Sequence, residues 1–439
     1  MGIPLNSLRQ ALLGWLLPLL LGLLAPGLRA TAAETQPELS EFPAGAARVA
    51  GRHIELVSDL PLSDELRELP AVFDAAMPQW QAMFQLSQAE VANWRVQAML
   101  MLDRQRFIDA GLLPAHLAHF RHGFQLGDRL WISEQASGYY RRHLLLHEGT
   151  HWIMTRKYGR QAPPWLMEGM AEWFGTHRWD GQRLEVGIIP AAREEVPYWG
   201  RVKIIQEQLA EGIAPSLESI LRYNDTAHQQ DDAYAWSWAA IVFLKQHPDT
   251  QATFKRLLEQ ALQSRDDSNR WLFGQLSRTW PRLRQQWSAT LPDFDYGFAP
   301  DRGLLCISDR PTALTAPHTV AVDSSRSWQA SGVVVQQGAQ ITIQAQGEFV
   351  VGDQPQPWRC TAEGVTLEYH SGRPLGRLMM TVVAPIVEEP QFSQPPPVMG
   401  VGSGGRFTMP RMGELHFRIN EASGDLADNR GSLSVTISP

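Results

Sequence analysis

The sequence predicts an α+β region, made of a small sheet plus helices, followed by an all-β sandwich. Two observations predict this order. Between about residues 60 and 290, stretches such as "DELRELPAVFDAAMPQWQAMFQ" and "TFKRLLEQALQ" repeat apolar residues at intervals of three and four, which is typical of helices. From about residue 320 the period changes to two, in "GVVVQQGAQITIQAQGEFVV" and "GSLSVTIS", between Gly and Pro turns.

Short apolar runs and a change of composition place the boundaries. The runs "GRHIELVSD", "RVQAMLMLD" and "DRLWISE" predict strands that precede the helices of the first region. Residues 34–297 therefore form the predicted α+β domain, and the Pro- and Gly-punctuated residues 298–319 form a predicted linker. The predicted sandwich covers residues 320–439, with "EEPQFSQPPPVMGVGSGG" as a long loop inside it.

The N-terminus carries a predicted export signal. Residues 1–33 combine an early Arg, an apolar run broken by Pro18 and small residues around Ala30 and Ala32, as in a cleavable secretory signal. The alternative is a retained membrane anchor, because the apolar run is only slightly short for a span. No later segment is apolar for long enough to cross a bilayer, so we expect a secreted or periplasmic bacterial protein. The net charge of −7 and the lack of a long basic run argue against a nucleic-acid partner.

The chain has two cysteines, Cys306 and Cys360. In an exported protein an even count permits one disulfide, and we expect that bridge, with two separate buried thiols as the alternative.

The motif "HEGTH" carries the chemistry. On a helix, His147 and His151 project from one face about one turn apart, so both imidazoles can bind one Zn²⁺. Glu148 then lies beside the metal-bound water, whose pKa zinc lowers to about 7, and can take its proton. A catalytic site also needs a third protein ligand. "PPWLMEGMAEWFG", twelve residues after His151, offers Glu168 and Glu172 on one face of a second helix.

These residues carry a family resemblance. "HEGTH", thirteen intervening residues and then "WLMEGMAE" resemble the gluzincin pattern HExxH…WLxEGxAE of the peptidase MA-like group of bacterial exported proteins. The resemblance covers roughly residues 48–290 and implies a zincin-like catalytic domain. It implies that His147, His151 and Glu168 are zinc ligands, that Glu148 is the general base, and that Glu172 hydrogen-bonds a ligand imidazole from behind.

A further segment, "YAWSWAAIVFL", resembles the part of zinc aminopeptidases whose tyrosine stabilises the oxyanion, which would be Tyr234 here. The alternative is that Tyr234 begins an amphipathic core helix. The aminopeptidases also carry a GxMEN strand that captures the free amine of the substrate, and "LGDRLWISEQ" lacks it. We therefore expect an endopeptidase.

The second informative stretch is "INEASGDLADNRGSLSVTI". Glu421, Asp425, Asp428 and Asn429 gather oxygen donors in one loop, which suits Ca²⁺ or an ordinary hairpin. Together with "GVVVQQGAQITIQAQGEFVVG", this stretch resembles the calcium-dependent galactophilic bacterial lectin. The resemblance implies side-chain calcium ligands from Glu421, Asp428 and Asn429, and backbone carbonyl ligands from Asp425 and Val351. The family has Asp at position 421 and Asn at position 428.

The sequence thus predicts a secreted zinc metallopeptidase, targeted to a glycan, cell wall or other surface by a lectin-like module. The cofactors would be Zn²⁺ and, in the module, Ca²⁺. One rival is a non-enzymatic surface or glycan-binding protein whose zinc is structural, in which Glu148 would have no role. Another is a metal hydrolase that acts on a non-peptide amide.

Overall fold

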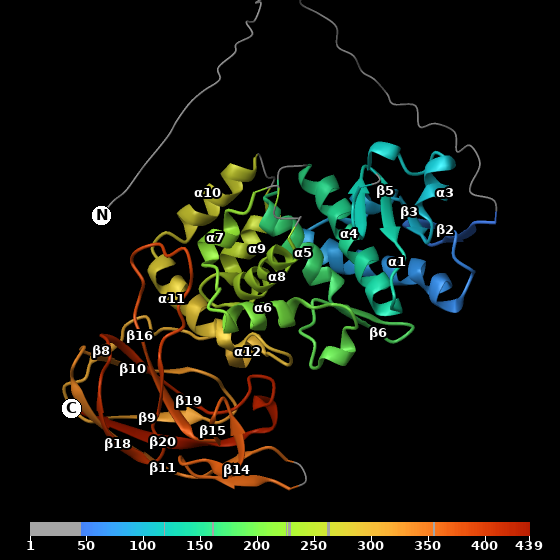
Figure 1. Cartoon of the computed structure of the whole chain (residues 1–439). Helices are drawn as coiled ribbons and strands as arrows, with labels where there is room; N and C mark the ends of the chain where they lie inside the picture. Colours follow the sequence, from blue (N-terminus) through green and yellow to red (C-terminus); the bar gives the residue numbers. More distant parts are fainter. Residues whose placement is uncertain are drawn as a thin grey trace, which may run out of the picture. The chain divides into compact units, whose positions relative to one another are not determined.

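The computed structural model describes residues 45–117, 119–159, 162–224, 226, 230–260, 264–353 and 356–439. The predicted signal at residues 1–33 lies outside these ranges. In the described part of the chain, no helix is long and apolar enough to cross a membrane. A region of mixed helices and strands precedes a β-rich C-terminal region (Figure 1), which confirms the coarse order that the two periods predict.

The first region begins with a five-stranded sheet in the order β1-β2-β3-β5-β4. The central strands β2, β3 and β5 are parallel, and the edge strands β1 and β4 pair antiparallel with their neighbours. The three predicted strands are β2, β3 and β5, whereas β1 and β4 were not predicted. The bounds are β1 Ala47–Ala50, β2 Ile54–Ser58, β3 Val96–Met101, β4 Gly123–Leu126 and β5 Arg129–Ser133.

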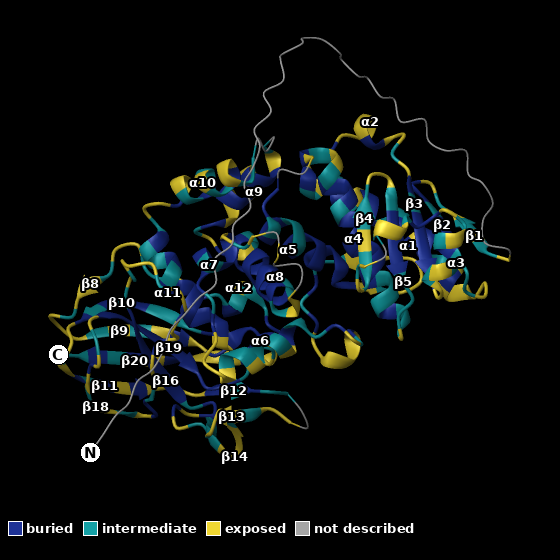
Figure 2. Cartoon of the chain, turned by 45° about the horizontal axis from the view of Figure 1, so that its top comes forward, coloured by how far each residue is buried: buried dark blue, intermediate teal, exposed yellow. Residues whose placement is uncertain are grey.

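Helices make up most of the rest of this region. Most of their buried side chains share one core cluster with part of the sheet, and α8 is buried over most of its length (Figure 2). A second cluster joins Val57, Met99 and Trp131 of the sheet to Phe107 of α3. The bounds are α1 Asp64–Phe84, α2 Gln88–Val91, α3 Arg104–Asp109, α4 Gly138–Tyr158, α5 Pro164–Gly175, α6 Arg201–Ala210, α7 Leu217–Leu221, α8 Asp231–Gln246, α9 Gln251–Glu259, α10 Arg265–Gln275, α11 Trp280–Thr290 and α12 Pro300–Gly303, with a hairpin of β6 His177–Trp179 and β7 Leu184–Val186 after α5.

Local sequence sets the ends of the two helices that carry the motif. The Ser137 side chain caps α4 by accepting a hydrogen bond from the Tyr140 amide, and Gly159, which directly follows the helix, adopts a φ of 62°. Pro164 begins α5 at a position where its missing N–H costs no helical hydrogen bond. The tryptophans Trp165 and Trp236 are fully buried, so packing in the core is their role.

The C-terminal region contains two main sheets, in the orders β17-β16-β19-β10-β8 and β13-β12-β20-β11-β18, with β9 paired to β20. Buried residues of both sheets, among them Ile343, Phe417 and Val435, share one core cluster. The bounds are β8 Thr312–Ala313, β9 His318–Asp323, β10 Gln329–Val335, β11 Gln340–Gln346, β12 Phe349–Val351, β13 Trp358–Cys360, β14 Val365–His370, β15 Arg373–Leu375, β16 Leu378–Val383, β17 Val398–Gly400, β18 Gly404–Thr408, β19 Gly413–Ile419 and β20 Arg430–Ser438.

The two regions belong to one compact unit by their contacts. Arg418 of β19 donates to Asp293 at 2.7 Å, and both side chains are buried. The loop between β16 and β17 also reaches the helices, since the amide of Ile386 donates to the Pro281 carbonyl at 2.7 Å. Within the predicted linker, Leu305 is fully buried, so this segment packs against the rest of the protein.

The expected disulfide is not formed, and both cysteines are free. Cys306 is exposed and its sulfur lies 3.8 Å from His247 Nε2, next to the helical region. Cys360 ends β13 and is buried in the core of the β region. An even count of cysteines does not show whether the two sulfur atoms lie close together. Cys306 lies next to the helical region, whereas Cys360 lies in the core of the β region.

Candidate metal centre

Helices α4 and α5 bring together the three predicted metal ligands. His147 Nε2 and His151 Nε2 lie 3.1 Å apart, and Glu168 Oε2 lies 3.4 Å from the first and 3.3 Å from the second. Atoms bound at zinc distances to one tetrahedral centre are separated by about 3.3 Å. The three atoms therefore have the spacing of three corners of a tetrahedral zinc site, and the donor set of two imidazoles and one carboxylate suits that ion.

The polar atoms of this triad are buried and short of partners. Glu168 Oε2 and the Nδ1 atoms of both histidines make no hydrogen bond with the described residues. Burial alone would raise the pKa of the Glu168 carboxyl, but His151 and His147 outweigh it and hold this pKa well below its usual range. Buried polar groups normally have partners, so a carboxylate oxygen left unpaired between two imidazoles fits a site for a cation.

Glu148, the predicted base, is buried beside the triad. Burial raises the pKa of its carboxyl above the ordinary value, although His151 and His147 oppose the rise. Gly123, the first residue of β4, lies against it, because a Cβ at position 123 would be 2.3 Å from Glu148 Oε1. Only glycine leaves the Glu148 carboxylate in its present position.

Glu172 is fully buried behind His147, with Oε1 3.4 Å from Nδ1 of that imidazole. Arg201 binds both of its carboxylate oxygens, at 2.8 and 3.0 Å, and the Trp199 indole donates to Oε2 at 3.0 Å. Burial would raise the pKa of Glu172, but Arg201 and then His143 keep it well below its usual range.

His143, His147 and Glu172 form a second group with metal-ligand spacing. His143 Nε2 lies 3.7 Å from Glu172 Oε1. A cation at this position would sit beside the Arg201 guanidinium, which already neutralises Glu172. The triad of His147, His151 and Glu168 is therefore the better candidate for a cation, and His143 packs behind it.

Tyr234 lies near the triad, in the first turn of α8. Its ring centroid is 5.9 Å from that of His147, and the Arg201 guanidinium carbon lies 5.2 Å from the centre of its ring. Burial raises the pKa of the Tyr234 hydroxyl, so this group keeps its proton at neutral pH. Tyr234 thus places its ring beside His147 with a protonated hydroxyl, and it also belongs to the first turn of a buried helix.

Sequence reasoning missed Gly123, Trp199 and Arg201. Trp199 and Arg201 follow Glu172 by 27 and 29 positions, and nothing in "VPYWGRVK" indicates that it returns to α5. The only signal for Gly123 is a glycine at the start of a strand, which often marks a close approach of another group.

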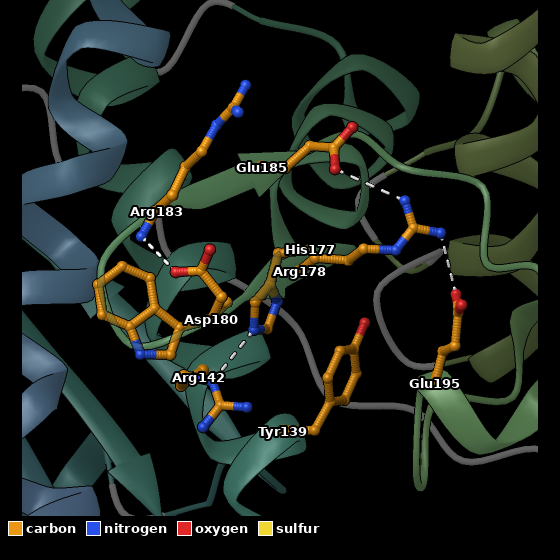
Figure 3. Close-up of a pocket in the computed structure, with 9 residues that line it drawn as sticks. Tyr139, Arg142, His177, Arg178, Asp180, Arg183, Glu185 and Glu195 are labelled. Atoms are coloured by element: carbon orange, nitrogen blue, oxygen red, sulfur yellow. Dashed lines mark hydrogen bonds and ion pairs between the residues drawn. The ribbon is translucent and has the colours of Figure 1, made fainter.

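A separate cavity of about 540 Å³ lies at the N-terminal end of α4 (Figure 3). Its charged groups mostly bind each other: Arg178 contacts Glu195 at 3.1 Å and Glu185 at 3.5 Å, and Arg142 Nε donates to His177 at 3.3 Å. Neither group with metal-ligand spacing lines this cavity. The lining residues are Tyr139, Arg142, His177, Arg178, Trp179, Asp180, Arg183, Glu185 and Glu195.

The second predicted site, the loop 421–429, is only partly assembled. Glu421 and Asn429 are buried and hydrogen-bonded to each other, and the amide of Gly352, next to Val351, donates to Asn429 at 3.3 Å. Asp425 and Asp428 are exposed. Burial raises the pKa of Glu421 to about 7, and the two aspartates add to this rise while Asn429 opposes it.

Comparison with known proteins gives one family model, a protein of unknown function (DUF1570), which matches residues 144–265. This segment holds most of α4 together with α5 and α8. No curated protein matches the chain. The family match therefore covers the candidate metal centre but gives it no activity.

Among solved structures, the EclA N-terminal domain, a PllA-like lectin, is 19% identical and covers 30% of this chain and 98% of its own, with a TM-score of 0.20. The IMPa metallopeptidase from Pseudomonas aeruginosa is 11% identical and covers 89% of this chain, with a TM-score of 0.17. This chain spans only 42% of the length of IMPa. Likenesses this weak carry no argument about the site.

Proposed function

We propose that the chain is an exported zinc-dependent peptidase that cuts within peptide chains. The observation that carries the proposal is the spacing of His147 Nε2, His151 Nε2 and Glu168 Oε2, at 3.1 to 3.4 Å from one another. The unpaired, buried oxygen of Glu168 supports it. Three protein ligands leave the fourth tetrahedral position open, as in catalytic zinc sites and unlike closed structural sites.

Zinc bound to this triad would supply an activated water and polarise the scissile carbonyl. The residues of the chain would do the rest. Glu148 has a raised pKa and would take a proton from the attacking water, then return it to the leaving amine. Tyr234 would donate a hydrogen bond to the oxygen that becomes negatively charged.

The edge strand β4 would hold the substrate. It pairs with β5 on one side, and in the described part of the chain no strand pairs with its other side. An extended peptide can add to such an edge through main-chain hydrogen bonds. Gly123 begins β4 beside Glu148, so a peptide on this edge would pass the base. Such binding needs no free terminus, which supports cleavage within chains.

Metal content and turnover test the proposal together. The purified protein should hold about one zinc per chain, and His147→Ala should lose it. Glu148→Gln should keep zinc and lose cleavage of unfolded protein substrates by about 10²-fold or more. Retention of zinc by His147→Ala would refute the ligand assignment. Full turnover by Glu148→Gln would refute its role as the base. Absence of turnover in the zinc-loaded wild type would favour the rival, a surface protein with a structural zinc.

The loop 421–429 supports a second activity, calcium-dependent binding of a glycan by the β region. Glu421 is a buried carboxylate close to two further acidic side chains, and a cation would relieve their repulsion. Calcium should raise the melting temperature of the full chain, and Glu421→Gln should abolish this shift. If calcium leaves the melting temperature of the wild type unchanged, the proposal for the loop is wrong.

A further inference from the structure

One buried guanidinium connects the helices that surround the metal centre. Arg201 is the first residue of α6, and it binds Glu172 of α5 through Nε and Nη2 at 3.0 and 2.8 Å. The same group lies over the ring of Tyr234 on α8, 5.2 Å from its centre. Glu172 in turn faces His147 on α4. Arg201 therefore contacts both the carboxylate behind a metal ligand and the candidate oxyanion donor.

The geometry of this contact is specific to arginine. The planar guanidinium donates two parallel hydrogen bonds to a carboxylate, which fixes the direction as well as the position of that group. The Trp199 indole supplies a third donor to the same carboxylate. Glu172 is 0% exposed, so its orientation depends on these protein donors and not on solvent.

Carboxylates behind ligand histidines fix the ring and increase its basicity, and their loss typically weakens metal binding 10- to 100-fold. Here Glu172 Oε1 lies 3.4 Å from His147 Nδ1, the nitrogen that faces away from the triad. Any rotation of the Glu172 carboxylate would change this contact. The residue that prevents the rotation therefore controls the orientation of a metal ligand.

We propose that Arg201 is a positioning residue of the metal centre: it locks Glu172 against His147 and holds Tyr234 beside the same imidazole. This inference rests on the proposed zinc peptidase function. Arg201 acts through Glu172 and Tyr234 and does not bind the substrate, so its loss should change zinc affinity and kcat while KM stays the same.

The test measures the zinc dissociation constant by chelator competition, together with kcat and KM, in the full chain. Glu172→Gln should raise the dissociation constant about 10- to 100-fold. Arg201→Lys keeps the charge but loses the paired donors, so it should raise the constant about tenfold and lower kcat without changing KM. Because Arg201→Met leaves a buried charge uncompensated and can fail to fold, it is combined with Glu172→Gln.

The double variant Arg201→Met/Glu172→Gln should bind zinc as Glu172→Gln alone does, because Arg201 has no carboxylate left to position. Arg142→Lys is the matched control, since Arg142 makes an ion pair with Glu68 at 3.0 Å and does not contact the triad. Its zinc affinity should stay within about twofold of the wild type. Arg142 is a half-buried arginine on α4, so Arg142→Lys measures how much any replacement of such an arginine by lysine changes zinc affinity.

Three outcomes overturn the inference. Arg201→Lys can bind zinc and turn over like the wild type, or the double variant can bind zinc more weakly than Glu172→Gln alone. Either result refutes the role of Arg201 while the zinc proposal stands. Absence of zinc from the wild type would refute both the proposed function and this inference.

Discussion

The two candidate metal sites differ in how much of each is assembled by the protein itself. At the metal centre, three ligand atoms from two helices already lie within 3.4 Å of each other, and Glu172 is fixed behind one of them. In the loop 421–429, Glu421 and Asn429 bind each other, while Asp425 and Asp428 remain at the surface. The ligand atoms of the first site are already close together, whereas those of the loop would have to move together to bind a cation.

The scaffold accounts for this difference. Side chains four residues apart on a helix share a face because the backbone hydrogen bonds fix them there. The loop has a single 3₁₀ turn at Leu426–Asp428, and the amide of Asp425 donates to the Ala422 carbonyl at 3.1 Å. We infer that the metal centre is selective by geometry, and that a cation bound by the loop would also order the backbone.

The largest effect should follow from a change at a preorganised contact, Gly123→Ala. The new Cβ would lie 2.3 Å from Glu148 Oε1 and 2.9 Å from its Cγ, so the flexible side chain of Glu148 should move away. Turnover should then fall by about 10²-fold, close to the loss of a general base, while zinc content stays the same. Peptide cleavage and zinc content, measured on one preparation, check this.

Gly274→Ala is the control, because a Cβ at this position of α10 meets no atom within 4 Å. It should leave turnover unchanged. Wild-type turnover in Gly123→Ala would show that Glu148 does not work from its present position. Loss of zinc would show that Gly123 supports the ligands and not the base.

Hydrogen exchange should show a smaller effect that separates the two sites. Calcium should slow the exchange of amides in 421–429 about tenfold, because the cation would order a loop with few backbone hydrogen bonds. Zinc should change exchange in α4 by less than about twofold, because its amides are already bonded in the helix. Glu421→Gln should remove the calcium effect. If the two metals slowed hydrogen exchange equally in the loop and in α4, the proposed difference between the two sites would be wrong.

Local patterns predicted the parts of the site that lie within one or two helices. The spacing of His147 and His151 follows from the helix period, and the order of helices and strands follows from the two periods of the sequence. Glu168 lies on the second helix, and the resemblance to the pattern WLxEGxAE assigned it as the third ligand. Tyr234 was placed by resemblance to a known segment, and the structure brings it within 5.9 Å of His147, between ring centroids. Its catalytic role stays a prediction.

The contacts that sequence reasoning missed come from tertiary packing. Arg201 reaches Glu172 only because α6 packs against α8 and α8 packs against α5, and no local pattern records that packing. The contact between Gly123 and Glu148 joins the edge strand β4 to helix α4, two elements that are separate in the sequence. The same limit explains why the expected disulfide is not formed: the cysteine count carries no information about the distance between Cys306 and Cys360.

The smallest effect concerns a third environment, the N-terminal end of α4, where most charged side chains bind each other (Figure 3). His177 stacks on Tyr139 with ring centroids 4.7 Å apart, and its Nδ1 donates to the Gly175 carbonyl at 2.8 Å. Burial lowers the pKa of His177 to about 3. The folded protein thus keeps this imidazole neutral, and the unfolded chain protonates it near pH 6.5.

Between pH 3 and 6.5 the unfolded state therefore binds one more proton at His177 than the folded state does. The free energy of unfolding should rise with pH in this window, by up to about 1.4 kcal/mol per pH unit from this group, and be lost as the pH falls. His177→Gln should flatten the slope by about one proton in urea unfolding at several pH values. The exposed His119→Gln should leave it unchanged. An unaltered slope in His177→Gln would mean that this end of α4 opens to water, and that only the metal centre is held rigidly.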